Sequence, residues 1–354
     1  MKKTLVILGG LLFGVFMLGI GQVIAQESIN LSLSQSIDLA LANNLELKKA
    51  SYQLGNAEID AKKSEAGNWL TQSNLIEREK ELLLLQEKDQ YQQQKDELLI
   101  QVVDEYFQLK SAQKDIQLKE KELELEKNIL GEVTAQVNAG YKVDLDLLQQ
   151  GNDYYDALFS YENTKQNYQQ YLMDFCMTLG FDANRKFELA TINIPDFKEI
   201  SLEQALQKGR KNSVELQAKA LETELARLEL EKTKVSDSSK LDLNELENNL
   251  AMAQLDYLIA NQDLTYQIQT QWQGYEQKKK DIGLSQQNLK QMEENKAIIT
   301  RQVKAGLRSE DEQLSANIGV LEAEYRLISS IRDYYASLLK LESIMGDLNK
   351  GEIQ

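Results

Sequence analysis

The chain is 354 residues long with a net charge of −16, and it contains one proline, one cysteine and no histidine. Folds built from many short strands need frequent turns, so this composition excludes a β-sandwich, a propeller or a β-barrel. One cysteine excludes a disulfide within the chain, and the acidic charge argues against nucleic acid as a partner. What remains is a protein of long, rarely interrupted helices.

The N-terminal segment has the pattern of an export signal. Met1–Lys3 is basic, residues 4–21 are apolar, and Val23–Ala25 supplies small or β-branched residues at the positions that precede a cleavage site. This pattern predicts a signal peptide over residues 1–25. The alternative is an uncleaved anchor, because the apolar run is close to the minimum length of about 18 residues for crossing a bilayer. In both cases the bulk of the chain lies outside the cytoplasm.

An internal repeat organises the rest of the chain. Four landmarks recur in the same order: residues 32–35 and 201–204, 43–47 and 212–216, 136–140 and 302–306, and 179–180 and 345–346. The repeat divides the chain into a first helical repeat (26–180), a linker (181–199), a second helical repeat (200–347) and a tail (348–354). The linker contains the only proline, Pro195.

Each repeat is predicted to contain three helices. The serine that opens each repeat is followed three residues later by glutamine, a capping-box pattern for a helix start. Gly140 and Gly306 suit the left-handed conformation that ends a helix, and Asp144 or Ser309 is expected to cap the helix that follows. The predicted helices are 33–66, 70–138 and 144–180 in the first repeat, and 202–235, 241–304 and 310–347 in the second.

The long helix of each repeat carries a coiled-coil seam with a period of seven residues. The apolar positions of the two seams are Leu109, Ile116, Leu123, Leu130 and Val137, and Ile268, Tyr275, Ile282 and Leu289. The two shorter helices together match the long one, which at 1.5 Å per residue spans roughly 100 Å. We therefore expect the short helices to stack end to end along the long helix, without a globular core. The apolar stripes then need further partners, which predicts oligomerisation.

The duplicated pattern resembles the TolC family of outer-membrane efflux proteins. The residues that carry the resemblance are Val137–Tyr141 with Asp146, Val303–Arg308 with Glu312, and the opening helix Leu33–Leu47. The resemblance covers essentially the whole chain after the leader. It implies an all-α fold with long coiled-coil hairpins, in which three chains close a twelve-helix α-barrel around a tunnel.

The resemblance also implies a function and partners. A homotrimer of this kind is an efflux or export conduit of the periplasm and outer membrane, and it works with a periplasmic adaptor and an inner-membrane transporter. The family's adaptor docks at the two hairpin tips, which correspond to Val137, Ala139, Gly140, Val303, Ala305 and Gly306. How this chain attaches to a membrane stays open, because the family places membrane-spanning strand pairs at the sites of Glu65–Gln72 and Val235–Leu241, and these segments are too short for them.

The acids beside the tips have two interpretations. In the first turn of a helix, acids favourably oppose the helix dipole whatever the function. The resemblance implies a second role, in which Asp146 and Glu312 line the tunnel entrance and Arg308 pairs with acid on the adjacent hairpin to hold it shut. The family's tyrosine partner is replaced by Val303 and its second acidic position by Ser315, so the latch and the ion filter are only partly preserved.

The leading hypothesis is a passive conduit, and the alternative is a structural coiled-coil spacer of the envelope that has lost transport. A polar lining of the tunnel favours the conduit, and an apolar one favours a solid bundle. An enzyme is not expected, because the sequence has no phosphate-binding loop, nucleophile elbow or metal-ligand spacing. No catalytic, cofactor-binding or metal-binding residue is therefore predicted, and no cofactor.

Overall fold

The computed structural model describes residues 29–182, 185, 187–236 and 239–348. The predicted signal peptide and most of the predicted tail lie outside these residues. The described elements are β1 (Ile29–Leu31), α1 (Leu33–Asn43), α2 (Leu45–Asn68), α3 (Asn74–Asn138), α4 (Asp144–Thr178), β2 (Phe187–Leu189), α5 (Leu202–Asn212), α6 (Val214–Lys234), α7 (Lys240–Lys304) and α8 (Glu310–Ile344). None of these helices has both the length and the apolar content to cross a membrane.

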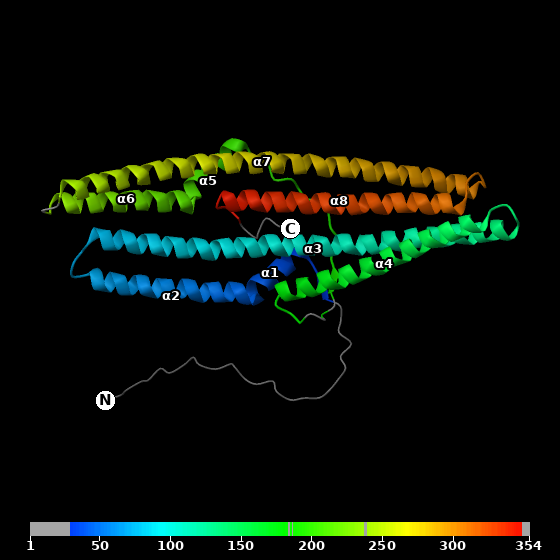
Figure 1. Cartoon of the computed structure of the whole chain (residues 1–354), viewed down its shortest axis with the longest axis horizontal. Helices are drawn as coiled ribbons and strands as arrows, with labels where there is room; N and C mark the ends of the chain where they lie inside the picture. The colour runs from blue at the N-terminus through cyan, green and yellow to red at the C-terminus, as the bar shows by residue number, and fades with distance from the viewer. Residues whose placement is uncertain (1–28, 183–184, 186, 237–238, 349–354) are drawn as a thin grey trace, which may run out of the picture.

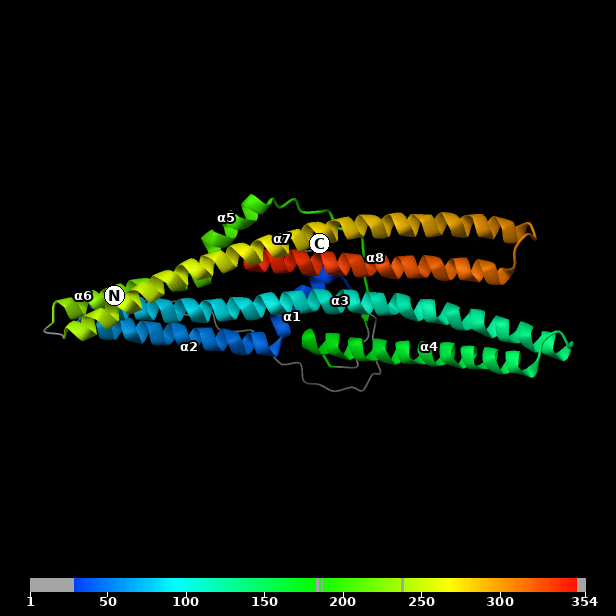
Figure 2. The ribbon, with the colours of Figure 1, turned by 45° about the horizontal axis from the view of Figure 1, so that its top comes forward.

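The architecture is a pair of long helical hairpins, one from each repeat. Helices α3 and α7 each have 65 residues, which corresponds to roughly 100 Å. Helices α2 and α4 follow one another along α3, and α6 and α8 do the same along α7 (Figure 1). Turning the molecule by 45° shows the same pairing (Figure 2). The predicted all-α fold with end-to-end stacking is therefore confirmed.

The first predicted helix of each repeat is interrupted, which corrects the single helices expected over 33–66 and 202–235. Asn44 has a ψ angle of 126° and Ser213 one of 114°, far from the helical value near −42°. The side chain of Asn44 accepts a hydrogen bond from the Leu47 amide, and Ser213 accepts one from the Leu216 amide. Each residue therefore acts as an N-cap that starts a second helix.

The linker packs against the first repeat at mid-length. Strands β1 and β2 form a short parallel pair with Ile29 opposite Phe187. The Tyr106 hydroxyl of α3 donates to the carbonyl oxygens of Leu31 and Ala190 at 3.2 and 3.3 Å. Burial raises the pKa of Tyr106 to about 12, so this hydroxyl stays a donor. The two three-residue strands are the only ones among the described residues, and the fold remains helical.

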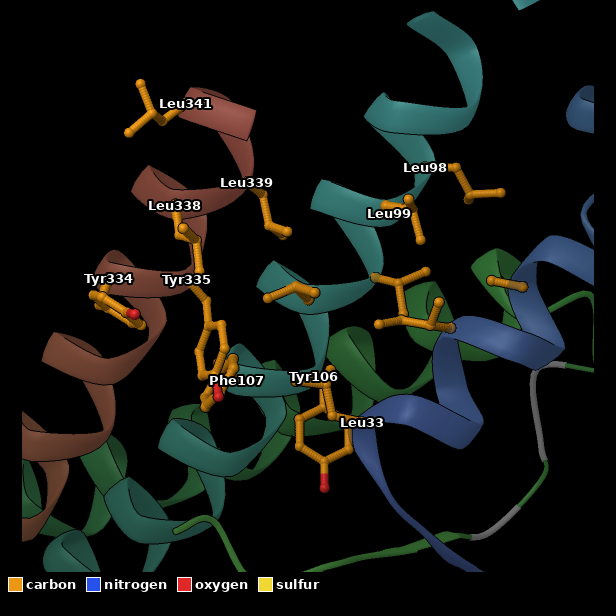
Figure 3. Packing of buried hydrophobic residues seen from close by; sticks show 14 of the residues in the cluster. Leu33, Leu98, Leu99, Tyr106, Phe107, Tyr334, Tyr335, Leu338, Leu339 and Leu341 are labelled. Carbon is orange, nitrogen blue, oxygen red and sulfur yellow. The ribbon is translucent and has the colours of Figure 1, made fainter. Parts of the chain in front are cut away.

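The core lies beside this strand pair and joins the two hairpins. Phe107 of α3 stacks on Tyr335 of α8 with ring centroids 5.4 Å apart, and Tyr335 meets Tyr334 edge to face at the same distance. Tyr334 in turn packs on Tyr275 of α7. Figure 3 shows the rings of Phe107 and Tyr335 between α3 and α8, with Tyr334 on the same helix as Tyr335. The predicted absence of a core is therefore wrong at mid-length, because aromatic side chains bridge the two repeats there.

The predicted seams are buried at four positions, Leu109, Ile268, Tyr275 and Ile282, whereas the other seam residues, Ile116, Leu123, Leu130, Val137 and Leu289, are half-buried. Ile268, Tyr275 and Ile282 have no exposed surface, and Leu109 is 1% exposed. Other apolar side chains stay uncovered in the single chain. They form stripes on α4 (Leu145, Leu148, Tyr155 and Phe159) and on α7 (Leu255, Ile259 and Tyr266). Their spacing of three, four and seven residues places each set along one helix face.

Candidate functional site at the glycine tips

The candidate site is the end of the molecule where the two long hairpins turn. The turns between α3 and α4 (residues 139–143) and between α7 and α8 (residues 305–309) lie at the same end (Figure 1). We call them the glycine tips. Gly140 has a φ of 78° and Gly306 one of 70°, the left-handed region that glycine enters without strain. The predicted requirement for glycine at both positions is confirmed.

Both glycine tips end the long helix in the same way. The amide of Tyr141 donates to the Gln136 carbonyl and that of Leu307 to the Gln302 carbonyl, each at 2.9 Å. A second bond runs from the amide of each glycine to the carbonyl three residues earlier. This pair of bonds is the Schellman motif, which satisfies the last carbonyl groups of a helix. The duplicated sequence landmark therefore encodes a duplicated turn.

The predicted docking residues occupy two environments. The valines, Val137 and Val303, are half-buried against their own hairpins, whereas Ala139, Gly140, Ala305 and Gly306 are exposed. Three larger apolar side chains beside them, Tyr141, Val143 and Leu307, are also exposed. Sequence reasoning did not single out Val143 or Leu307 as surface residues. Each tip therefore presents a short turn of alanine and glycine, with exposed apolar side chains beside it.

The acids at the start of α4 act locally. The N-cap residue of α4 is Val143, and Asp146 accepts a hydrogen bond from its amide at 3.1 Å. The expectation that Asp144 caps this helix is therefore wrong, because Asp144 is already its first residue. Both carboxylates lie in the first turn, where their negative charge is favourable beside the helix dipole.

The start of α8 contains the predicted capping box and an ion pair. The Ser309 hydroxyl accepts from the Glu312 amide, and the Glu312 carboxylate accepts from the Ser309 amide at 2.9 Å. The Arg308 guanidinium donates to the other oxygen of Glu312 at 2.8 Å. Arg308 therefore contacts an acid of its own helix within one chain. Its pairing with Asp146 stays a prediction for contacts between chains.

A contact that sequence reasoning missed joins the two hairpins near their tips. The side-chain amide of Asn128 on α3 donates to the Asp311 carboxylate on α8 at 2.9 Å. The two residues are 183 positions apart, and neither lies on an apolar seam, so no local pattern marks the pair. Asp311 is one of three acids in the first turn of α8.

Further polar contacts follow the same α3–α8 seam away from the tips. Lys114 pairs with Glu324 at 2.8 Å, and the Asp96 carboxylate accepts from the Ser343 hydroxyl at 2.8 Å. Burial raises the pKa of Asp96, and the Ser343 and Gln92 hydrogen bonds act in the opposite direction. The two hairpins therefore meet through polar contacts on both sides of the aromatic core.

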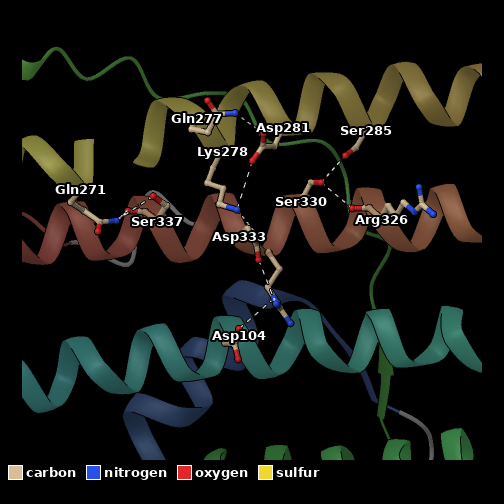
Figure 4. Close-up of polar contacts among 11 residues, drawn as sticks. Asp104, Gln271, Gln277, Lys278, Asp281, Ser285, Arg326, Ser330, Asp333 and Ser337 are labelled. Carbon is tan, nitrogen blue, oxygen red and sulfur yellow. Dashed lines mark hydrogen bonds and ion pairs between the residues drawn. The ribbon is translucent and has the colours of Figure 1, made fainter. Parts of the chain in front are cut away.

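Another contact between α3 and α8 belongs to a chain of charged residues that extends across three helices. Arg332 of α8 lies 3.6 Å from Asp104 of α3 and 3.4 Å from its own neighbour Asp333, which pairs with Lys278 of α7 at 2.9 Å. Figure 4 shows the chain running from Asp104 to Lys278. Alternating charges of this kind orient the helices relative to one another, since each group satisfies its neighbour.

Comparison with known proteins gives a match in structure and none in sequence. No family model and no curated protein matches the chain. Among solved structures, the CmeC outer membrane channel of Campylobacter jejuni matches with a TM-score of 0.65 and 12% identity, over 95% of this chain and 94% of that chain. The outer membrane protein VceC of Vibrio cholerae matches with a TM-score of 0.62 and 12% identity, over 89% and 96%.

A third matching structure is an outer membrane channel in its open state. The MtrE outer membrane channel of Neisseria gonorrhoeae, in its open state, matches with a TM-score of 0.60 and 12% identity, over 93% of this chain and 94% of that chain. All three alignments include both hairpins, because nine-tenths of each chain is covered. The described chain therefore has the helical hairpin fold of TolC-family channels.

Proposed function

We propose that this chain, which has the fold of TolC-family channels, is a subunit of an efflux or export conduit in the bacterial cell envelope. The observation that carries the proposal is the structural match to outer membrane channels over at least 89% of this chain and of each channel. Here both hairpins, their turns and the linker between them are retained.

The uncovered apolar stripes support assembly into a homotrimer. The α4 and α7 stripes lie on different hairpins of the chain, so one chain offers two separate surfaces for neighbouring copies. Burial of apolar area contributes about 25 cal/mol per Å², and several leucine and aromatic side chains per stripe make association favourable. Closing a ring of three chains would cover both stripes in every copy.

The glycine tips would then form the entrance of the tunnel. We assign adaptor docking to Val137, Ala139, Gly140, Val303, Ala305 and Gly306, with the exposed Tyr141 and Leu307 beside them as apolar contacts. Asp146, Glu312 and Arg308 would ring the aperture. The mechanism is passive: the tips separate, solute passes, and an inner-membrane transporter linked through a periplasmic adaptor supplies the energy.

The first test is the mass and shape of the assembly. Light scattering of the exported chain should give three times the mass of one chain, and electron microscopy should show a hollow tube about 100 Å long or more. A compact monomer would contradict the conduit. A trimer with a filled centre would instead support the structural spacer, because such a bundle offers no path for solute.

A further inference from the structure

A small cavity lies where α3, α4 and α8 converge, between the aromatic core and the glycine tips. Its volume is about 160 Å³. Oxygen-bearing side chains from all three helices line it, among them Ser111 and Asp115 of α3, Thr164 and Asn167 of α4, and Tyr325 of α8. We call it the three-helix cavity. A polar lining of this kind between packed helices is typical of a site that holds ordered water or a ligand.

The hydroxyl of Ser111 is buried in the wall of this cavity without a partner. Ser111 is 6% exposed, and no described residue forms a hydrogen bond with its Oγ. A serine within a helix can donate to the carbonyl four residues earlier, as Ser330 does to Arg326 at 3.0 Å. The Ser111 hydroxyl makes no such bond. Because an unpaired buried hydroxyl destabilises a fold, its position in the cavity wall indicates a ligand.

Asp115 supplies a negative charge one turn further along the same face of α3. It is half-buried, and no described group donates a hydrogen bond to it. Burial raises the pKa of its carboxyl, against a smaller opposing effect of Lys119. The ammonium of Lys119 itself pairs with Glu122 at 2.8 Å. Lys114, the preceding residue, pairs with Glu324 on α8 at 2.8 Å. Asp115 is therefore a partly desolvated charge without a neutralising contact.

The positive charge of the three-helix cavity lies at its other end. Arg332 of α8 also lines the cavity, but its guanidinium is held by Asp104 and Asp333 at 3.6 and 3.4 Å. Asp104 precedes Asp115 by three turns of α3, which corresponds to roughly 16 Å. The end of the cavity beside Asp115 is therefore negative.

We propose that the Asp115 end of the three-helix cavity binds one monovalent cation, an alkali-metal or ammonium ion, through the Asp115 carboxylate and the hydroxyls of Ser111 and Thr164. One carboxylate balances one positive charge, and the neutral oxygen atoms complete its surroundings. The bound ion would join α3 to α4 within the first hairpin.

A divalent ion does not fit this set of side chains. Calcium sites draw on several carboxylates, and the described residues contain no group of three or more histidine, cysteine or acidic side chains that could hold a metal. The cavity lies within one chain, so the inference does not depend on whether an assembly conducts solute.

Sodium NMR of the exported chain tests the proposal directly, because exchange with a protein site broadens the signal of Na⁺. The broadening should decrease when K⁺ or NH₄⁺ is added at constant ionic strength, and these two arms show which ion binds more tightly. N-methyl-D-glucamine, a cation too bulky for the cavity, should displace no Na⁺. Asp115→Asn should raise the dissociation constant by about tenfold or more, because it removes the charged ligand.

Glu120→Gln is the matched control, since it removes the same charge from an exposed position of the same helix. It should bind Na⁺ like wild type. Equal broadening by Asp115→Asn and wild type, or displacement by N-methyl-D-glucamine, would overturn the proposal. Either result would assign the broadening to general counterion attraction by a chain of charge −16.

A second variant distinguishes a bound ion from ordered water in the cavity. With N-methyl-D-glucamine as the only cation, Ser111→Ala should unfold at a higher temperature than wild type, because it lacks the unpaired hydroxyl. In NaCl or KCl at the same ionic strength, this advantage should disappear or reverse, since wild type then gains a ligand that Ser111→Ala binds more weakly. An advantage of the same size in every salt would overturn the proposal, because the hydroxyl would then contact water alone.

Discussion

Asn128 and Asp311 come from different repeats, and the 2.9 Å hydrogen bond between them is the hydrogen bond nearest the glycine tips that joins the two hairpins of the described chain. It lies in an exposed setting, so it exchanges readily with water. A bond of this kind contributes about 1 kcal/mol or less. It is therefore suited to holding the tips together without locking them.

Replacing Asp311 by Ala should let the tips of one chain separate. Spin labels on cysteines at exposed Lys142 and Lys304 should give a broader and longer distance distribution than in wild type. The native Cys176 is buried and should not react. Glu310→Ala is the matched control, because it removes a neighbouring first-turn acid and an equal dipole contribution. If both variants broaden the distribution equally, the hydrogen bond does not hold the tips.

Replacing Gly140 or Gly306 by Ala should destabilise the protein by about 1–2 kcal/mol, the cost of a left-handed conformation for an L-residue. The cause is backbone strain alone, because no atom lies within 4 Å of the position that the new Cβ would take. The measurement is urea-induced unfolding followed by circular dichroism.

Gly131→Ala serves as the control for the glycine tips, since this glycine is inside α3 with equally open surroundings. It should stabilise the protein by about 0.5–1 kcal/mol through helix propensity. A loss of stability at position 131, or none at positions 140 and 306, would contradict the role assigned to the two turns.

Glu105→Gln should raise the unfolding temperature at pH 7.5. Burial raises the pKa of Glu105 although Gln101 and Thr178 donate to one carboxylate oxygen, and the other oxygen is buried without a partner. A raised pKa in the folded state means that the protonated form is favoured, so stability is present at low pH and lost as the pH rises through that pKa. Glutamine resembles the protonated form at every pH.

The advantage of Glu105→Gln should therefore shrink as the pH falls to about 4, near the usual pKa of glutamate. Thermal unfolding at several pH values measures this. Exposed Glu97 on the same helix provides the control, and Glu97→Gln should change the unfolding temperature little across the range. A wild type more stable than Glu105→Gln at pH 7.5 would show that the carboxylate has a cationic partner in the assembly.

Arg308→Ser tests the proposed latch. The Arg308–Glu312 pair is exposed, so its loss should cost about 0–1 kcal/mol and leave folding intact. Conductance or solute passage through the assembled tube should increase, with a greater preference for cations, because the acids at the aperture lose a positive neighbour. Arg326→Ser removes a similar pair with Glu322 further along α8 and should leave conductance unchanged. A large loss of stability without a change in passage would assign Arg308 a structural role.

The sequence predicted the elements that depend on periodic or local signals. The heptad of Ile268, Tyr275 and Ile282 marks a buried seam, and Gly140 and Gly306 mark turns, because each pattern has one physical cause. The breaks at Asn44 and Ser213 were missed although both are good N-cap residues, since the apolar pattern continues across them. The Asn128–Asp311 and Arg332–Asp104 contacts join distant segments, and single polar residues on a solvated helix do not specify such partners.

The two repeats have helices of matched length: 65 residues in α3 and α7, and 35 in α4 and α8. Inserting one heptad into α3 and α4 alone would extend one hairpin by about 10 Å. The extended tip would project beyond its neighbour, and the rim of any ring built from these hairpins would become stepped. Tolerated insertions and deletions in this chain should therefore occur as paired events, with the same number of residues gained or lost in both repeats.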